Sequence, residues 1–161
     1  MEFNSAQSAG SPRSPVKPAL NRGEIMFKGI NWLAVVLAAF ANVAIGFVWF
    51  NVLFTQQWHA LDPSAPAMTG FDPKRLGGVV CALLIFTGQA WIFARTGVSS
   101  LRSALLTALF VCITFDSTVY AGFVFFSGGS AKAMAFYGAF DVVGYLVGGA
   151  ILGLMRPKTA S

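Results

Sequence analysis

Residues 30–54, INWLAVVLAAFANVAIGFVWFNVLF, decide the fold class of this chain, because they contain no charged side chain. A helix needs about 20 apolar residues to cross roughly 30 Å of hydrocarbon. The run does not alternate between apolar and polar residues, as a membrane strand would. Because lipid offers no partner to backbone amides, a run of this kind must be helical. It therefore predicts a transmembrane helix.

Three more apolar runs follow, at about 76–94, 101–126 and 133–155. Hydrophobic residues make up 56% of the chain and charged residues only 11%, whereas soluble domains carry about 25% charged residues. We therefore predict an all-α membrane protein, a four-transmembrane-helix bundle in which residues 26–156 form one domain in the lipid bilayer.

The connections between the runs are polar. The first, Thr55–Arg75, contains Asp62-Pro63, Ala65-Pro66 and Asp72-Pro73, and such X-Pro steps break helices. Trp58, in the same loop, is expected to anchor at the membrane interface. The other two connections, at 95–100 and 127–130, are tight turns that make neighbouring helices antiparallel.

Lysine and arginine counts predict the orientation. Near the membrane one side would carry Arg22, Lys28, Arg95, Arg102, Arg156 and Lys158, and the other side Lys74, Arg75 and Lys132. The positive-inside rule places the richer side in the cytoplasm. Both termini are then cytoplasmic (N-in/C-in), and residues 157–161 form a short cytoplasmic tail.

Residues 1–25 differ from the rest in composition, since Ser, Pro, Gly, Ala and Asn dominate. They contain no apolar stretch that would make a secretory signal, and they predict a disordered leader. Met26 begins a segment that looks like a natural start. An added expression sequence, a start codon assigned too early and an organelle transit peptide all stay open as origins.

Several chemistries are not indicated. The basic residues flank the apolar runs in ones and twos, which does not suggest nucleic-acid binding. Cys81 and Cys112 lie inside apolar runs, and the lone His59 has no second ligand at metal-binding spacing. We expect no metal, no cofactor and no enzyme activity, because no nucleophile or phosphate-binding motif is present.

Two aspartates interrupt the third and fourth runs. Asp116 and Asp141 both lie within about a turn of the predicted bilayer midplane, where an aspartate costs roughly 2.5 kcal/mol or more. Apart from Arg102 at the very start of the third run, no Lys, Arg or His lies inside a run, so the aspartates should be protonated, share a proton or hold a cation. The candidate polar site is completed by Asn42, Gln89, Thr114 and Ser117, with Thr118 and Tyr120 as further nearby oxygens.

This polar site has two interpretations. It is either a proton or cation site, or a set of hydrogen bonds that join helices. The second is preferred, because proton pathways usually extend over several polar residues.

Small residues recur at four-residue spacing. The first run carries Ala34, Ala38, Asn42 and Gly46, and the last carries Gly144-x-x-x-Gly148 and Gly149-x-x-x-Gly153. Such ridges let helices approach closely, either within one chain or between subunits. Packing within the chain is the default, and two glycine faces on one helix are expected to leave one for another subunit.

The sequence also resembles a known family. The motifs that carry the resemblance are Asn31-Trp32-Leu33-Ala34, Gly46-Phe47-Val48-Trp49-Phe50, Phe54, Trp58, Asp141, Gly144-Tyr145 and Gly149-x-Ile151-Leu152-Gly153. Together they are similar to the DUF1761 family of small membrane proteins, over about residues 30–155. Phe50 stands where that family is expected to have Tyr, and Asn51-Val52 where Ser-Pro is usual. The resemblance implies four helices in a bacterial cytoplasmic (inner) membrane and no assigned activity.

Three functions follow from these observations. The first is a non-enzymatic protein that associates with itself, as a homo-oligomer, or serves as an accessory subunit of a membrane complex. The alternative is a small proton- or cation-coupled transporter or channel that uses Asp116 and Asp141. The third is a membrane enzyme acting on a lipid or quinone, which no motif supports.

Overall fold

The computed structural model describes residues 29–63, 73 and 76–156, and the regular secondary structure of this part is helical. Its elements, in chain order, are α2 (Trp32–Val48), the π-helical turn η1 (Trp49–Leu53), α3 (Thr55–Leu61), α4 (Leu76–Thr96), α5 (Leu101–Val111), the π-helical turn η3 (Cys112–Asp116), α6 (Ser117–Ser127) and α7 (Ala131–Leu154). The all-α prediction is confirmed. The predicted leader and the predicted cytoplasmic tail lie outside the described residues.

Four helical segments are long and apolar enough to cross a membrane: Trp32–Leu53, Leu76–Thr96, Leu101–Phe126 and Ala131–Leu154. They agree with the four predicted runs to within two residues at each end. The first segment joins α2 to η1, and the third joins α5, η3 and α6 into one continuous helix.

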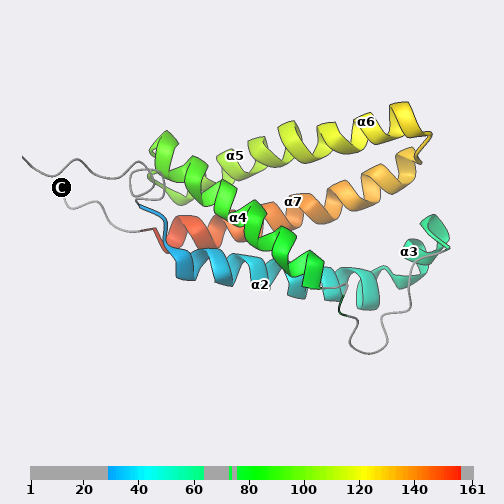
Figure 1. Ribbon diagram of the computed structural model, residues 1–161, viewed down its shortest axis with the longest axis horizontal. Helices are drawn as coiled ribbons and strands as arrows, with labels where there is room; N and C mark the ends of the chain where they lie inside the picture. The colour runs from blue at the N-terminus through cyan, green and yellow to red at the C-terminus, as the bar shows by residue number, and fades with distance from the viewer. Residues whose placement is uncertain (1–28, 64–72, 74–75, 157–161) are drawn as a thin grey trace, which may run out of the picture.

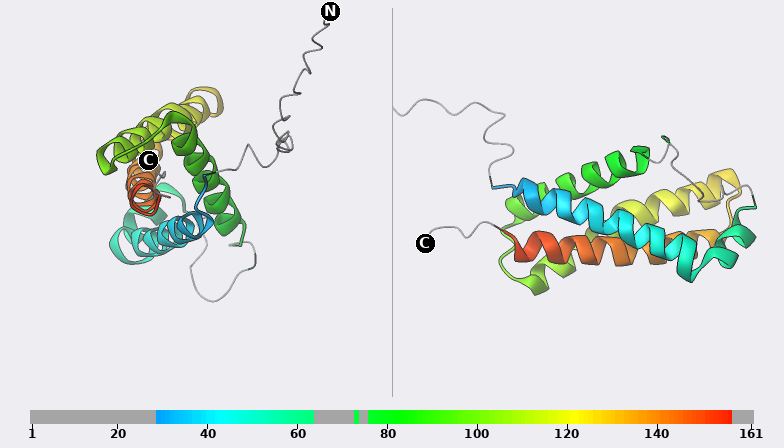
Figure 2. Two further views of the ribbon diagram at one scale, coloured as in Figure 1. Left: turned by 90° about the vertical axis from the view of Figure 1, so that its left-hand side faces the viewer. Right: turned by 90° about the horizontal axis from the view of Figure 1, so that it is seen from below.

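The helices are arranged around α7. Seen along the bundle, α7 lies between α2 on one side and α5–α6 on the other, and α4 occupies the remaining side (Figure 2). α4 crosses α7 obliquely, whereas α2 and α7 run side by side (Figure 1). The start of α2 and the end of α7 lie at the same end of the bundle. Which side of the membrane this end faces stays a prediction.

Asn31 fixes that end of the bundle. Its side-chain oxygen accepts hydrogen bonds from the amides of Leu33 and Ala34, which caps α2. Its Nδ2 atom donates to the carbonyl oxygen of Met155 at 2.7 Å, which ties the start of α2 to the end of α7. The two tight turns each contain a glycine with positive φ, Gly97 at 66° and Gly128 at 70°, a conformation that glycine adopts without strain.

The first connection differs from the prediction. The loop predicted over 55–75 begins with helix α3, and Trp58 within it is only 8% exposed. The Trp58 Nε1 atom donates to the hydroxyl of Tyr137 at 3.2 Å, and its ring packs on Phe50. Trp58 therefore joins α3 to η1 and α7, and its place at the membrane interface stays a prediction.

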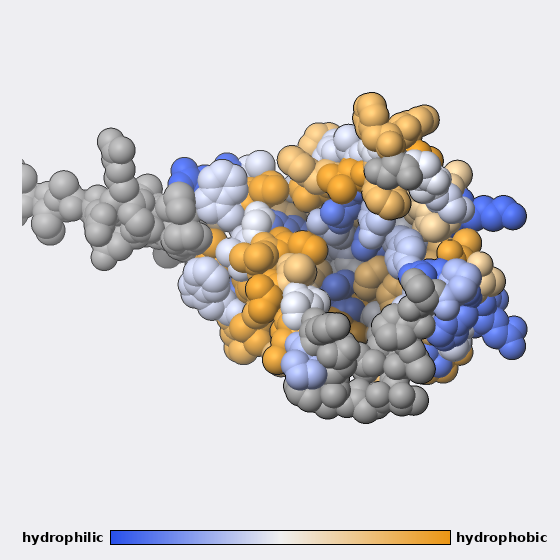
Figure 3. Space-filling model, turned by 45° about the vertical axis from the view of Figure 1, so that its right-hand side comes forward, coloured by the Kyte–Doolittle hydropathy of each residue, from blue (hydrophilic) through white to orange (hydrophobic). Residues whose placement is uncertain are grey.

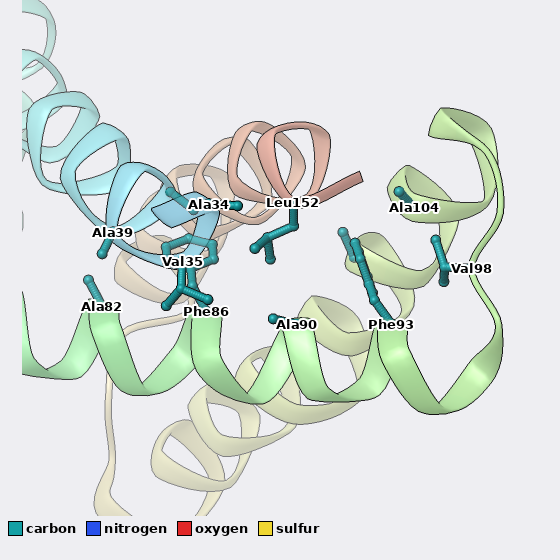
Figure 4. Close-up of a cluster of buried hydrophobic side chains, with 12 residues drawn as sticks. Ala34, Val35, Ala39, Ala82, Phe86, Ala90, Phe93, Val98, Ala104 and Leu152 are labelled. Atoms are coloured by element: carbon teal, nitrogen blue, oxygen red, sulfur yellow. The ribbon is translucent and has the colours of Figure 1, made fainter. Parts of the chain in front are cut away.

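The buried residues gather in one half of the bundle, at the end where α2 begins and α7 ends; we call it the packed half. The main cluster contains Ala34, Val35, Ala38, Ala39, Ala82, Phe86, Ala90, Phe93, Val98, Ala104, Ala108 and Leu152. Figure 4 shows these side chains meeting between α2, α4, α5 and α7. Alanine dominates the cluster, so the helix backbones lie close together there.

The glycines of α7 make this close packing possible. A Cβ atom at Gly148 would overlap the ring of Phe86, and one at Gly144 would overlap the side chain of Asn42. At Gly149 and Gly153 an added Cβ would lie 2.6 Å from Ala108 and Ala104 respectively. Both glycine faces are thus occupied within the chain, and the expectation that one is left for another subunit is corrected. Gly46 packs less tightly, on Phe140, with an added Cβ 3.5 Å from the ring.

The other half of the bundle is open. Among its residues with described side chains, 40–63, 76–81, 113–126 and 128–143, only Trp58 is buried. An added Cβ at Gly122 of α6 or Gly138 of α7 would meet nothing within 4 Å. Figure 3 shows a hollow between hydrophobic walls, with hydrophilic residues inside it. We call this half the open half.

The packing at Gly148 predicts a large effect of a single methyl group. Gly148→Ala should lower the free energy of unfolding by about 1–3 kcal/mol, because the fully buried Phe86 ring has no free space to move into. Gly88→Ala is the matched control, since nothing lies within 4 Å of an added Cβ at Gly88. Thermal unfolding of the purified variants in detergent measures the difference, and equal melting temperatures would contradict this account of the packing.

Candidate functional site: two aspartates in the membrane-spanning helices

The structure brings the two intramembrane aspartates together where the packed half meets the open half. Asp116 is the last residue of the π-helical turn η3, and Asp141 lies in the middle of α7. The two carboxyl groups are close enough to interact electrostatically, and both side chains are half-buried. π-Helical turns inside α-helices occur frequently at functional sites.

Three tyrosines surround the aspartates. Tyr137, Asp141 and Tyr145 follow one another at four-residue spacing on α7, so they lie on one face of that helix. Tyr145 lies close enough to Asp116 for the two side chains to interact electrostatically. On α6, Tyr120 lies four residues after Asp116, and its ring stacks on Tyr137 with 6.1 Å between centroids and 3° between planes.

The carboxyl group of Asp141 is not fully hydrogen-bonded by the described residues. Its Oδ2 atom is buried and has no hydrogen-bond partner among the described residues. The described basic residues of the spans, Arg95, Arg102 and Lys132, lie in the first or last turn of their helices. None of them is at the depth of the aspartates, so any charge on this pair has to be balanced by a proton or an added cation.

Gln89 and Asn42 lie next to this site. Gln89 is 1% exposed, and its Nε2 atom donates to the carbonyl oxygen of Tyr145 at 3.5 Å. Its Oε1 atom is buried without a partner in the described part of the chain. The side chain of Asn42 contacts Gly144, three residues beyond Asp141. The polar residues predicted on α2 and α4 thus meet α7 within about one turn of the aspartates.

The hydroxyl-bearing residues of the third span differ in where their side chains lie. Ser117, which follows Asp116, lines a cleft between α6 and α7. Thr114 is exposed and donates to the carbonyl oxygen of Phe110 at 2.7 Å. Thr118 is likewise exposed and donates to the carbonyl oxygen of Thr114 at 2.7 Å. The structure does not bring these two threonines to the aspartates, because each hydroxyl satisfies a carbonyl of its own helix.

A cleft lies between α6 and α7, within about one helical turn of the aspartates. Its volume is about 290 Å³, and the residues that line it include Ser117, Tyr120, Met134, Gly138 and Val142. Gly138 and Val142 flank Asp141 on α7 at distances of three residues and one residue along the chain. An added Cβ at Gly138 would meet nothing within 4 Å, so this glycine leaves space rather than filling a contact.

Sequence reasoning missed Tyr137 and Tyr145. Their four-residue spacing on either side of Asp141 was visible in the sequence and places all three on one helix face. It also missed the aromatic cluster around Trp49, to which Phe50, Phe54, Trp58, Phe136 and Phe140 contribute. Aromatic residues are common in membrane helices, so nothing in their spacing marked these as neighbours.

These features define a small multi-pass membrane protein, with four apolar helices and an acidic pair between two of them. The chain belongs to the DUF1761 family: the family model, described as a protein of unknown function, matches residues 33–153. The resemblance seen in the sequence is thereby confirmed. The comparison with curated proteins finds no match, and neither does the comparison with solved structures.

The unpartnered oxygen of Asp141 predicts a gain in stability when its charge is removed. Asp141→Asn should raise the free energy of unfolding by about 0.5–2 kcal/mol, because a neutral amide of the same shape removes the repulsion from Asp116. Thr118→Val, in which an exposed hydroxyl is lost, should leave stability nearly unchanged. Melting curves in detergent at neutral pH measure both. A clear loss of stability in Asp141→Asn would favour a purely structural role for this aspartate.

Proposed function

We propose that this protein transports a proton or a small cation across the membrane, and that Asp116 and Asp141 bind it. The observation that carries the proposal is the pairing of two half-buried carboxyl groups without a described basic side chain at their depth. Such groups are expensive in a membrane and are typical of proton and ion pathways. No covalent chemistry is part of the proposal.

The difference between the two halves of the bundle supports transport. Between the end that carries α3 and the aspartates, the helices of the open half are loosely packed, since the described side chains of this stretch of α6 and α7 are exposed or half-buried. On the other side of the aspartates lie Cys112, Tyr145 and Gly148, all buried. A site open to one side and closed to the other is what a transporter has in one of its two states.

The turn η3 supplies a position where this state can change. It lies between α5, which packs tightly on α7 in the packed half, and α6, whose described side chains are not buried. We propose that α6 moves relative to α5 at this turn, so that access to Asp116 changes during transport. Hinges of this kind are a few residues at the ends of elements.

Association was the function preferred from the sequence, on the basis of free glycine faces, short loops and the absence of a catalytic constellation. We rank it second here, because both glycine faces of α7 are filled within the chain. We retain a homo-oligomer or a larger membrane complex as the proposed setting of the transport site, because four helices alone enclose little space. The proposed location, the cytoplasmic membrane of a bacterium with both termini inside, rests on the family resemblance and on the distribution of Arg and Lys.

Flux measurements in liposomes test the proposal. Purified protein is reconstituted with a pH-sensitive dye inside, and an imposed potential drives protons or, in parallel experiments, Na⁺ or K⁺. Asp116→Asn and Asp141→Asn should each reduce flux to the level of empty liposomes, because neither amide can bind a proton or pair with a cation. Thr118→Val is the control and should retain flux.

Reconstitution efficiency is checked for every variant by the amount of protein recovered in the liposomes. If both asparagine variants transport as well as the unchanged protein, the aspartates do not carry the ion. Transport that is absent from the unchanged protein for H⁺, Na⁺ and K⁺ would contradict the proposal for these ions.

A further inference from the structure

The aspartates lie between layers of aromatic rings. Tyr120 and Tyr137 each lie one helical turn from their aspartate, toward the end that carries α3, and the two rings stack on each other across the α6–α7 seam. On the opposite side, Tyr145 lies one helical turn beyond Asp141 on α7. Rings from α6 and α7 therefore enclose the carboxyl pair from two directions along the bundle axis.

The ring of Tyr137 is held firmly in this position. Its hydroxyl accepts the hydrogen bond from Trp58, and its ring contacts Phe50 and Phe136 at 5.9 and 5.6 Å between centroids. Three elements, η1, α3 and α7, thus fix one ring of the stacked pair. A group that is already ordered loses little conformational freedom when a ligand binds.

Ring faces and carboxylates together are typical of sites that bind organic cations. The face of an aromatic ring carries partial negative charge and attracts ammonium groups, and cages of aromatic rings bind quaternary ammonium ions. A bare metal ion would instead require several oxygen ligands around it. The described residues contain no group of three or more His, Cys, Asp or Glu side chains able to hold one.

The cleft beside the aspartates gives space for the rest of such a molecule. Its walls are largely apolar, with Met134 and Val142 on α7 facing Tyr120 on α6, and its volume is about 290 Å³. Sites for small molecules usually measure about 300–1,000 Å³, so this cleft suits a compact molecule. The aspartates do not line the cleft, but they adjoin the lining residues Ser117 and Val142 in the sequence, and the lining suits alkyl groups.

We propose that the Asp116–Asp141 site binds a compact alkylated ammonium ion, with the charged nitrogen near the carboxyl groups and the rings of Tyr120 and Tyr137, and the alkyl groups in the α6–α7 cleft. This inference rests on the proposed transport function and names the class of cation. A protein that exchanges protons for such cations would use the same aspartates for both, so the two ligands compete.

Binding of radiolabelled tetraethylammonium to the purified full chain in nanodiscs tests the inference. We expect saturable binding that unlabelled tetraethylammonium displaces and an equal concentration of NaCl does not. Asp141→Asn should abolish the binding. Tyr120→Leu should weaken it about fivefold, the effect of losing a cation–π contact of about 1 kcal/mol, whereas Tyr120→Phe keeps the ring and should bind within twofold of the unchanged protein.

Phe125→Leu provides the matched control, because it removes a ring from the same helix at a position that is 82% exposed. It should leave binding unchanged. Each variant is accepted only if its melting temperature is no lower than that of the unchanged protein and its elution in size-exclusion chromatography is the same. Equal loss of binding in Tyr120→Leu and Phe125→Leu would overturn the assignment of the cation to the Tyr120 ring.

The two proposals fail in different ways. If tetraethylammonium does not bind, or NaCl displaces it equally well, the ammonium site is overturned, while aspartate-dependent flux of protons or metal cations would leave the transport proposal standing. If tetraethylammonium binds as expected but neither asparagine variant alters any flux, the transport proposal is overturned, and with it the role of this site in moving the cation.

Discussion

The close approach of α7 to its neighbours is the constraint on which the rest of the structure depends. In lipid the hydrophobic effect does not drive helices together, so they associate through van der Waals contact and hydrogen bonds. Contact of this kind requires that backbones come close, and Gly148 and Gly149 allow it against Phe86 and Ala108. The packed half exists because glycine and alanine face one another there.

The open half begins where this pattern ends. Beyond Gly144, toward the start of α7, the residues that face α2 are large, and Phe136 and Phe140 meet Trp49 at about 6 Å between centroids. Aromatic rings of this size hold helices further apart than alanine does. On the other side of α7, η3 separates the tightly packed α5 from α6, whose described side chains remain outside any core. The change of residue size along α7 therefore places the aspartates at the boundary.

Much of the fold was predictable, because hydrophobic runs, proline steps and glycine turns act through local physical rules. Such patterns predicted the four spans and the turns around Gly97 and Gly128. They also marked the two aspartates as candidate functional residues. Helix α3 was missed because it is short and lies in a loop whose later prolines suggested irregular structure. Thr114 was placed in the site by proximity in sequence alone, and the helix face it occupies turns it outward. The π-helical turns leave no signature in residue types, since they depend on how neighbouring helices pack.

The location of the carboxyl pair argues for a bound ion more strongly than its composition does. Within the packed half glycine and alanine bring the backbones together, which leaves little space for a hydrated counterion. Far into the open half, a carboxylate would be solvated or neutral at little cost. Few neighbouring groups would then fix the position of an ion bound to it. At the boundary, Gln89 on the packed side donates to the carbonyl oxygen of Tyr145, while a cleft lies on the side toward α6. A carboxyl pair placed there keeps one buried oxygen without a partner, and a proton or cation arriving through the open half can supply that partner and leave again.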